Sequence, residues 1–222
     1  MIEPRVLIQE DWILAVFLLI LVLFTIVKLN EPKRLQMLYR MFSVRGPQTD
    51  FFAFDSNLLN WFNVILSGVF FMAFGLLIYR LIEMYSVEIP FDLNEVSLFG
   101  LIVLGLMLYS LARKFIGHAI GLVVESHAKV KRYFLLKQLY SQWIGLFLIP
   151  FLLLEFYSPI SGVNFTYALL LVYAFLQILS YARITYVFVF EGDSPSYHLF
   201  AYICALEILP LLVLVKIALN LL

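Results

Sequence analysis

The sequence predicts an all-α fold: a polytopic helical membrane bundle with six transmembrane helices and one amphipathic helix at the cytoplasmic interface. Of its 222 residues, 64% are hydrophobic and 14% are charged, whereas about 25% are charged in an ordinary soluble domain. The apolar runs are continuous, as from Ile13 to Phe24, while the strands of a membrane barrel would alternate. These observations exclude a soluble domain, a disordered chain and a nucleic-acid-binding protein with a basic surface.

Six runs can cross a bilayer, since about 20 mainly apolar residues span about 30 Å of hydrocarbon. We expect one membrane domain over residues 1–222. The first run follows an acidic start and continues to Lys28 without a small-residue cleavage site. It is therefore a retained helix and not a signal peptide. The predicted spans are 12–27, 58–79, 96–116, 139–156, 165–190 and 199–219.

The distribution of basic residues predicts the orientation. With the N-terminus outside, 12 of the 15 Lys and Arg residues lie on or beside the first, third and fifth connections. Cytoplasmic connections are enriched in these residues. The opposite side keeps Arg5, Arg80 and Lys216. Both termini are therefore expected outside the cytoplasm.

The first connection, from Lys28 to about Phe54, is long enough to contain a helix. Asn30 is a suitable cap and Pro32 suits the first turn. An apolar face and a group of basic side chains then predict a helix in the membrane interface, although a plain basic loop remains an alternative. The apolar face is Leu35, Leu38, Tyr39 and Phe42, and the expected lipid-headgroup contacts are Lys33, Arg34 and Arg40.

Two further connections carry specific expectations. Asp55 or Ser56 would cap the second span. The third connection, residues 125–138, would prolong the third span as a helix into the cytoplasm. Its Lys129, Lys131 and Arg132 are further candidates for lipid-headgroup contacts.

Glu207 lies near the middle of the sixth run, and a charged side chain there costs about 2.5–3.5 kcal/mol on insertion scales. Pro210 leaves the carbonyl of Leu206 without its helical donor. Arg183 in the fifth span has a similar depth, about 10–13 Å at about 1.5 Å per residue. We expect Glu207 and Arg183 to pair, and a double-mutant cycle without coupling would contradict this. The pair could be a proton or substrate site, or an ion pair that sets helix register.

Other polar residues have simpler interpretations. Arg80 and Glu83 are spaced as a local surface pair. Glu155 is expected to be an interfacial carboxylate. Gln142 and Gln177 can form hydrogen bonds between helices. Two prolines, Pro150 and Pro210, are expected to kink their helices.

No catalytic motif for a metalloprotease, a phosphate-binding loop or a nucleophilic serine is present. His118, His127 and His198 lie near the predicted cytoplasmic interface without a metal or haem pattern. We therefore expect no cofactor and no metal, and an enzyme is not favoured.

The stretch from Phe200 to Lys216, with Glu207 and Pro210, resembles the end of an uncharacterised Bacteroidota membrane protein family, the domain of unknown function DUF4271. The stretch from Gly145 to Pro150 also fits that family. The resemblance implies a small, polytopic protein of the bacterial inner membrane, with both termini then periplasmic. It implies no activity.

Three functions follow as hypotheses. The first is a non-catalytic subunit or scaffold of a cell-envelope complex, which would contact lipid and other membrane subunits or copies of itself. The second is a small transporter or channel with a site at Glu207 and Arg183. The third is a lipid-modifying enzyme whose basic cytoplasmic face holds a phosphate headgroup, with a cleft lined by Arg113, His118, Lys129 and Arg132.

Overall fold

The computed structural model describes residues 11–40, 60–84, 94–123, 127–158 and 162–190. These residues form helices, with no strand among them, which confirms the all-α class. Five helices are long and apolar enough to cross a membrane. The sixth predicted span, 199–219, lies outside the described residues. The helices are α1 (Asp11–Asn30), α2 (Pro32–Arg40), α4 (Trp61–Met84), α5 (Glu95–Val123), α6 (His127–Tyr157) and α7 (Val163–Phe190).

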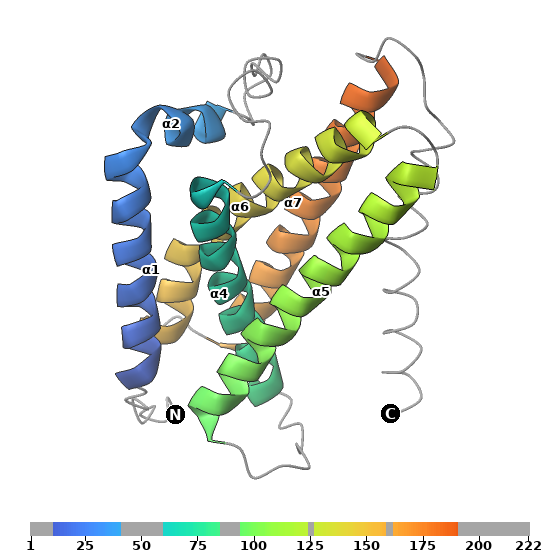
Figure 1. Cartoon of the computed structure of the whole chain (residues 1–222). Coiled ribbons are helices and arrows are strands. Elements are labelled where there is room, and N and C mark those ends of the chain that lie inside the picture. Colours follow the sequence, from blue (N-terminus) through green and yellow to red (C-terminus); the bar gives the residue numbers. More distant parts are fainter. Residues whose placement is uncertain (1–10, 41–59, 85–93, 124–126, 159–161, 191–222) are drawn as a thin grey trace, which may run out of the picture.

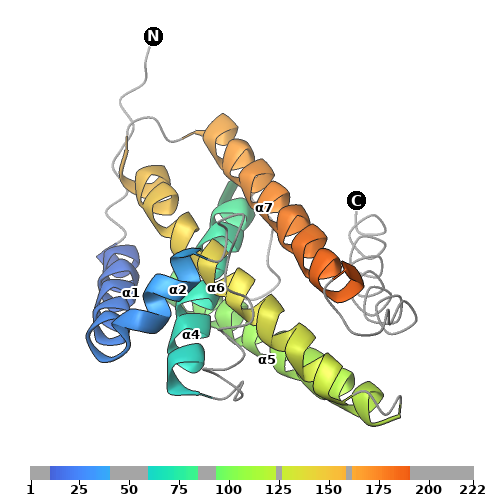
Figure 2. The same cartoon turned by 90° about the horizontal axis from the view of Figure 1, so that it is seen from above.

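The long helices alternate in direction, so that successive helices run up and down through the bundle (Figure 1). The centre is the α4–α6 pair, which makes the most extensive helix contact. Seen from above, α1 and α7 lie on opposite sides of this pair (Figure 2). The short helix α2 crosses the end of the bundle at which α1 ends, and it contacts α1 and α6.

Two apolar clusters fill the bundle, one toward each end. The cluster beside α2 includes Leu38, Leu66 and Leu136, all fully buried. The other joins α1, α4, α5, α6 and α7 and includes Leu76 and Leu148. Glycines permit close helix contacts here. A Cβ placed on Gly145 of α6 would lie 2.8 Å from the Cα of Phe70 on α4, so only glycine fits between these backbones.

Two helices start with cap residues other than those predicted. Asn30 is the last residue of α1, and the Glu31 carbonyl accepts the first α2 hydrogen bond, from the Leu35 amide at 3.3 Å. Glu31 is thus the cap residue, and its carboxylate pairs with Arg34 at 2.7 Å. The second span starts at Trp61, and the carbonyl of Asn60 accepts from the Val64 amide at 3.0 Å. Asp55 and Ser56 are therefore too early to cap it.

The third connection also differs from the prediction, because most of it belongs to the following helix and not to the preceding one. Helix α5 does extend past the predicted span, to Val123. The basic segment belongs instead to α6, which starts at His127 and carries Lys131 and Arg132 in its first turns. Pro150 lies inside α6.

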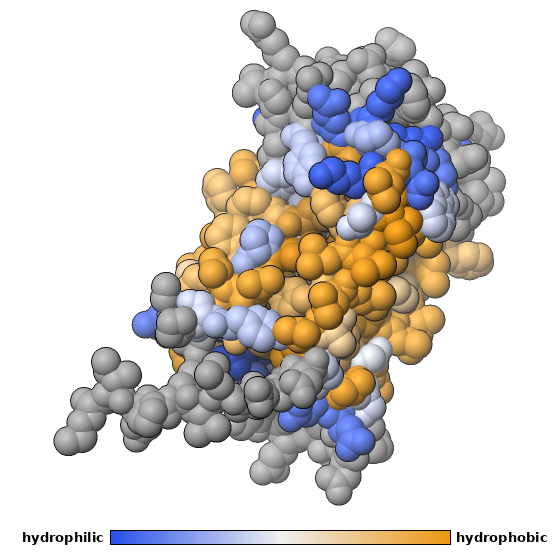
Figure 3. Space-filling model, turned by 90° about the vertical axis from the view of Figure 1, so that its left-hand side faces the viewer, coloured by the Kyte–Doolittle hydropathy of each residue, from blue (hydrophilic) through white to orange (hydrophobic). Residues whose placement is uncertain are grey.

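The surface shows a broad apolar zone. Figure 3 shows hydrophobic residues across the middle of one face, with hydrophilic residues gathered toward both ends. Of the five long apolar helices that the structure describes, α5 is the most exposed. Only 6% of its most apolar 18-residue stretch is buried, against 50% for that of α4. Leu101, Leu104, Leu108 and Phe115 are among its exposed side chains. Such a surface requires either lipid or another apolar helix around it.

Candidate functional site: a buried ionic cluster

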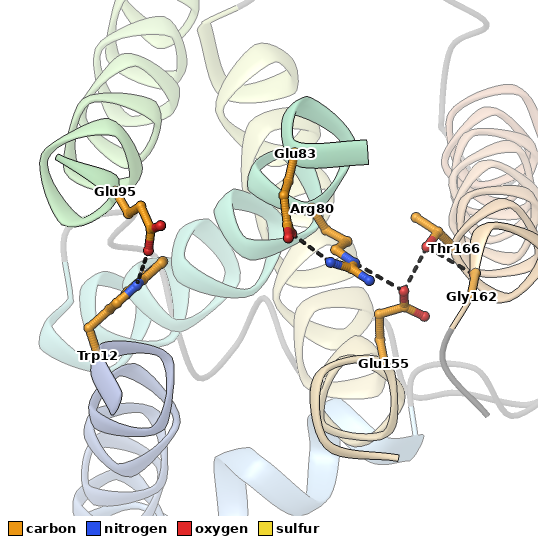
Figure 4. Close-up of polar contacts among 7 residues, drawn as sticks. All are labelled: Trp12, Arg80, Glu83, Glu95, Glu155, Gly162 and Thr166. Atoms are coloured by element: carbon orange, nitrogen blue, oxygen red, sulfur yellow. Dashed lines mark hydrogen bonds and ion pairs between the residues drawn. The ribbon is translucent and has the colours of Figure 1, made fainter. Parts of the chain in front are cut away.

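Three helix ends meet at the end of the bundle opposite α2. Arg80 lies one turn before the end of α4, Glu155 lies in the last turn of α6, and Thr166 lies in the first turn of α7. Because successive helices alternate in direction, these three positions come together (Figure 4).

The side chains form a continuous chain of hydrogen bonds. Arg80 donates from Nη1 to Glu83 Oε2 at 2.6 Å and from Nε to Glu155 Oε1 at 3.3 Å. The Thr166 hydroxyl donates to the same Glu155 Oε1 at 2.7 Å, and its oxygen lies 3.4 Å from the carbonyl oxygen of Gly162. The cluster, which we call the Arg80–Glu155 cluster, therefore ties α4, α6 and α7 together. It consists of Arg80, Glu83, Glu155 and Thr166.

Burial differs sharply within the cluster. The Glu155 side chain is 1% exposed and that of Arg80 is 16% exposed, whereas that of Glu83 is 32% exposed. The Arg80 guanidinium also lies 5.9 Å from the centre of the Phe156 ring. A buried carboxylate is costly unless it is paired and hydrogen-bonded. Arg80 and Thr166 meet this need for Oε1, but Oε2 is buried and accepts no hydrogen bond within the described part of the chain.

These contacts revise two expectations. Arg80 and Glu83 do pair, yet Arg80 is not limited to a local surface pair, because it also binds Glu155 on another helix. Glu155 lies in the last turn of its helix, as expected for an interfacial position, but its side chain is buried between helices. The sequence did contain a signal. Arg80 and Glu155 lie at the same end of their predicted spans, on the same predicted side of the membrane, but they are 75 residues apart.

A second polar network lies toward the other end of the bundle, where α4 starts. Gln142 on α6 donates to the Asn63 carbonyl at 3.0 Å and to the Ser67 hydroxyl at 3.1 Å, both on α4. Gln138 also bonds Ser67, at 3.0 Å, and accepts from Lys114 of α5 at 3.0 Å. The predicted cross-helix bond of Gln142 is thus confirmed.

Among the described residues, the partner of Gln177 lies on its own helix and not on another one. Its amide nitrogen donates to the Tyr173 hydroxyl at 2.9 Å, one turn earlier in α7. This bond lies within one helix. Tyr173 in turn stacks on Phe74 of α4, with ring centres 4.8 Å apart. Gln177 therefore positions a side chain at the α4–α7 contact.

The predicted intramembrane pair remains a prediction. Arg183 lies on α7 with a half-buried side chain. Glu207 and Pro210 lie outside the described residues, as does His198.

The predicted headgroup contacts fall on two helices at one end of the bundle. Lys33 is exposed on α2, and Arg34, besides its ion pair with Glu31, lies over the Phe62 ring at 5.9 Å. Lys131 is exposed on α6, while Arg132 and Arg113 are half-buried. Arg40 belongs to α2, His118 to α5, and His127 and Lys129 to α6. The structure does not describe the side chains of these four residues. Among the described residues, no group of His, Cys, Asp or Glu is arranged to hold a metal ion.

The fold and these two polar layers define a bundle of membrane-length helices that is linked near both ends by hydrogen bonds between helices. Arg80 and Ser67 are 13 residues apart on α4, which places the layers about 20 Å apart. The chain belongs to the family described as Domain of unknown function (DUF4271), whose model matches residues 13–218. No match was found among curated proteins or among solved structures.

Proposed function

We propose that this chain is a multi-pass protein of the bacterial inner membrane that serves as a non-catalytic subunit or scaffold of a cell-envelope complex. The exposed apolar face of α5 carries the proposal. Among the described helices, α5 packs mainly against α4 and α6, and large apolar side chains of α5 are exposed.

The shape of this face supports contact with another helix. Gly100 and Gly105 lie on it, and a Cβ placed on either residue would meet no atom within 4 Å. Small residues allow two membrane helices to approach closely. Lipid can also cover an apolar face, so the experiment must separate a protein partner from lipid.

The two polar networks between the helices also fit a structural role. The Arg80–Glu155 cluster and the Gln138–Gln142 network each join three helices. Buried polar networks of this kind favour one helix arrangement over others. They supply a rigid bundle on which another subunit could assemble.

The test is purification of the tagged full-length protein from its native membrane in mild detergent. The expected result is a complex of fixed stoichiometry that is larger than the monomer. Gly105→Leu should weaken it at least tenfold, because the leucine side chain would hold a partner helix away. Gly68→Leu on α4 is the matched control, since a Cβ on Gly68 also meets no atom within 4 Å. A monomer alone, or equal effects of the two variants, would contradict the proposal.

A further inference from the structure

The two oxygens of the Glu155 carboxylate have different surroundings. Oε1 accepts from Arg80 and from Thr166, while Oε2 is buried and has no hydrogen-bond donor among the residues that the structure describes. A carboxylate oxygen can only accept hydrogen bonds or bind a cation. An ionised oxygen left in this state inside a protein is strongly unfavourable.

Within the described part of the chain, the charges of the Arg80–Glu155 cluster do not balance. Arg80 supplies one positive charge to two carboxylates, those of Glu83 and Glu155, so the cluster has a net charge of −1. The carboxylate of Glu95, at the same end of the bundle, accepts from the Trp12 indole at 3.2 Å and is separate from the cluster (Figure 4). A bound cation would balance the cluster.

The backbone adds to this preference. Helix α6 ends at Tyr157, and the last carbonyl groups of a helix point outward from its end without partners in the same helix. These carbonyls give the helix end a partial negative charge, which favours a cation. The hydroxyl oxygen of Thr166 and the carbonyl oxygen of Gly162 lie within 3.4 Å of one another beside the carboxylate.

The chemistry favours a small monovalent cation over a divalent one. Calcium and magnesium require at least six oxygen ligands and usually more than one carboxylate. Only one carboxylate oxygen of the buried Glu155 is unengaged, and a guanidinium already contacts the same carboxylate. One positive charge is also what the net charge of the cluster calls for.

We propose that Glu155 Oε2 anchors a binding site for one Na⁺ ion between the ends of α4 and α6 and the start of α7. The oxygens of Thr166 and Gly162 would complete the nearby ligands. The proposal is independent of the scaffold function, because it concerns a site within a single chain.

The experiment measures thermal unfolding of the purified full-length protein in detergent micelles, in sodium chloride and in choline chloride of equal ionic strength. Because a ligand that binds only the folded state stabilises it, we expect sodium to raise the midpoint by about 3 °C. Glu155→Gln should abolish the difference, since the amide keeps an acceptor for Arg80 and Thr166 but replaces Oε2 with an NH₂ group. Glu95→Gln is the matched control, at the same end of the bundle, and should keep the sodium effect.

A second variant covers the case in which Glu155→Gln does not fold. Thr166→Val removes one oxygen beside the carboxylate and should weaken the apparent sodium affinity about tenfold. Equal midpoints of the wild type in sodium and choline would overturn the proposal, as would a sodium effect that survives Glu155→Gln. Stabilisation by acid in choline with no response to sodium would also overturn it, because the occupant would then be a proton.

Discussion

Glu155 is the most buried charged residue in the described part of the chain, and its hydrogen bonds join three helices. The two carboxylates that pair with Arg80, those of Glu155 and Glu83, differ in exposure. Exposure decides how much each ion pair contributes to stability. A pair with high solvent access contributes about 0.2–1 kcal/mol, whereas removing one partner of a buried pair costs about 3–5 kcal/mol. The same guanidinium takes part in both kinds of contact, so Arg80 allows the two to be compared directly.

We predict that Glu155→Ala lowers the free energy of unfolding by about 3–5 kcal/mol, because it leaves Arg80 half-buried without its buried partner. Glu83→Ala should cost at most about 1 kcal/mol. Chemical unfolding in micelles measures both values. In the double mutant Arg80→Ala, Glu155→Ala, the loss should be smaller than the sum of the single losses. Equal losses for the two glutamate variants would contradict this assignment.

The helices themselves were largely predictable, but their contacting faces were not. Continuous apolar runs identify helices of membrane length, because the backbone must satisfy its own hydrogen bonds in lipid. The same runs are apolar on every side, so periodicity does not indicate which face contacts a neighbour. On α6 the contact is decided by Gly145, whose missing side chain lets α4 approach.

We predict that Gly145→Ala destabilises the bundle by about 1–3 kcal/mol, because the added methyl group would meet the backbone of Phe70 and separate α4 from α6. Gly68→Ala is the control on α4, where the added Cβ has open space. It should be neutral or slightly stabilising, since alanine favours a helix more than glycine does. The measurement is the unfolding free energy of each variant in micelles. A Gly145→Ala variant as stable as Gly68→Ala would show that this close contact is unimportant.

At the scale of the whole bundle, most basic residues in the described helices lie toward one end. The ends of α1, α5 and α7 and the starts of α4 and α6 lie together at one end of the bundle (Figure 1). These regions carry Lys28, Arg113, Lys131 and Arg183, whereas Arg80 lies toward the opposite end. The distribution matches the excess of Lys and Arg expected on the cytoplasmic side.

We predict that both termini lie outside the cytoplasm. In a Cys204→Ser background, which removes the single native cysteine, single cysteines at Ile2 and Leu221 should react with a membrane-impermeant thiol reagent on intact spheroplasts. A cysteine at the exposed Lys131 is the control and should react only after the membrane is permeabilised. Reaction of only one terminus would instead indicate an odd number of spans, and the reverse pattern would invert the orientation.

The sequence by itself determined the helical class, the approximate positions of five spans and the expected side of each connection. These properties depend on composition and on the order of residues along the chain, because length and hydropathy decide which segments can lie in lipid. It also placed Gln142 correctly between helices. The start of α4 and the cap of α2 were displaced by one to a few residues, because Asn60 and Glu31 supply the first acceptors instead.

Only the tertiary structure decided which polar groups meet. Arg80, Glu155 and Thr166 are distant in sequence and occur in three different helices, and none of them belongs to a motif. Their meeting depends on helix rotation about each axis, which side-chain packing sets and which uniformly apolar helices do not reveal. The sequence could therefore identify Glu155 as a carboxylate near a membrane interface, but only packing of the helix ends buries it and leaves one oxygen without a hydrogen-bond donor.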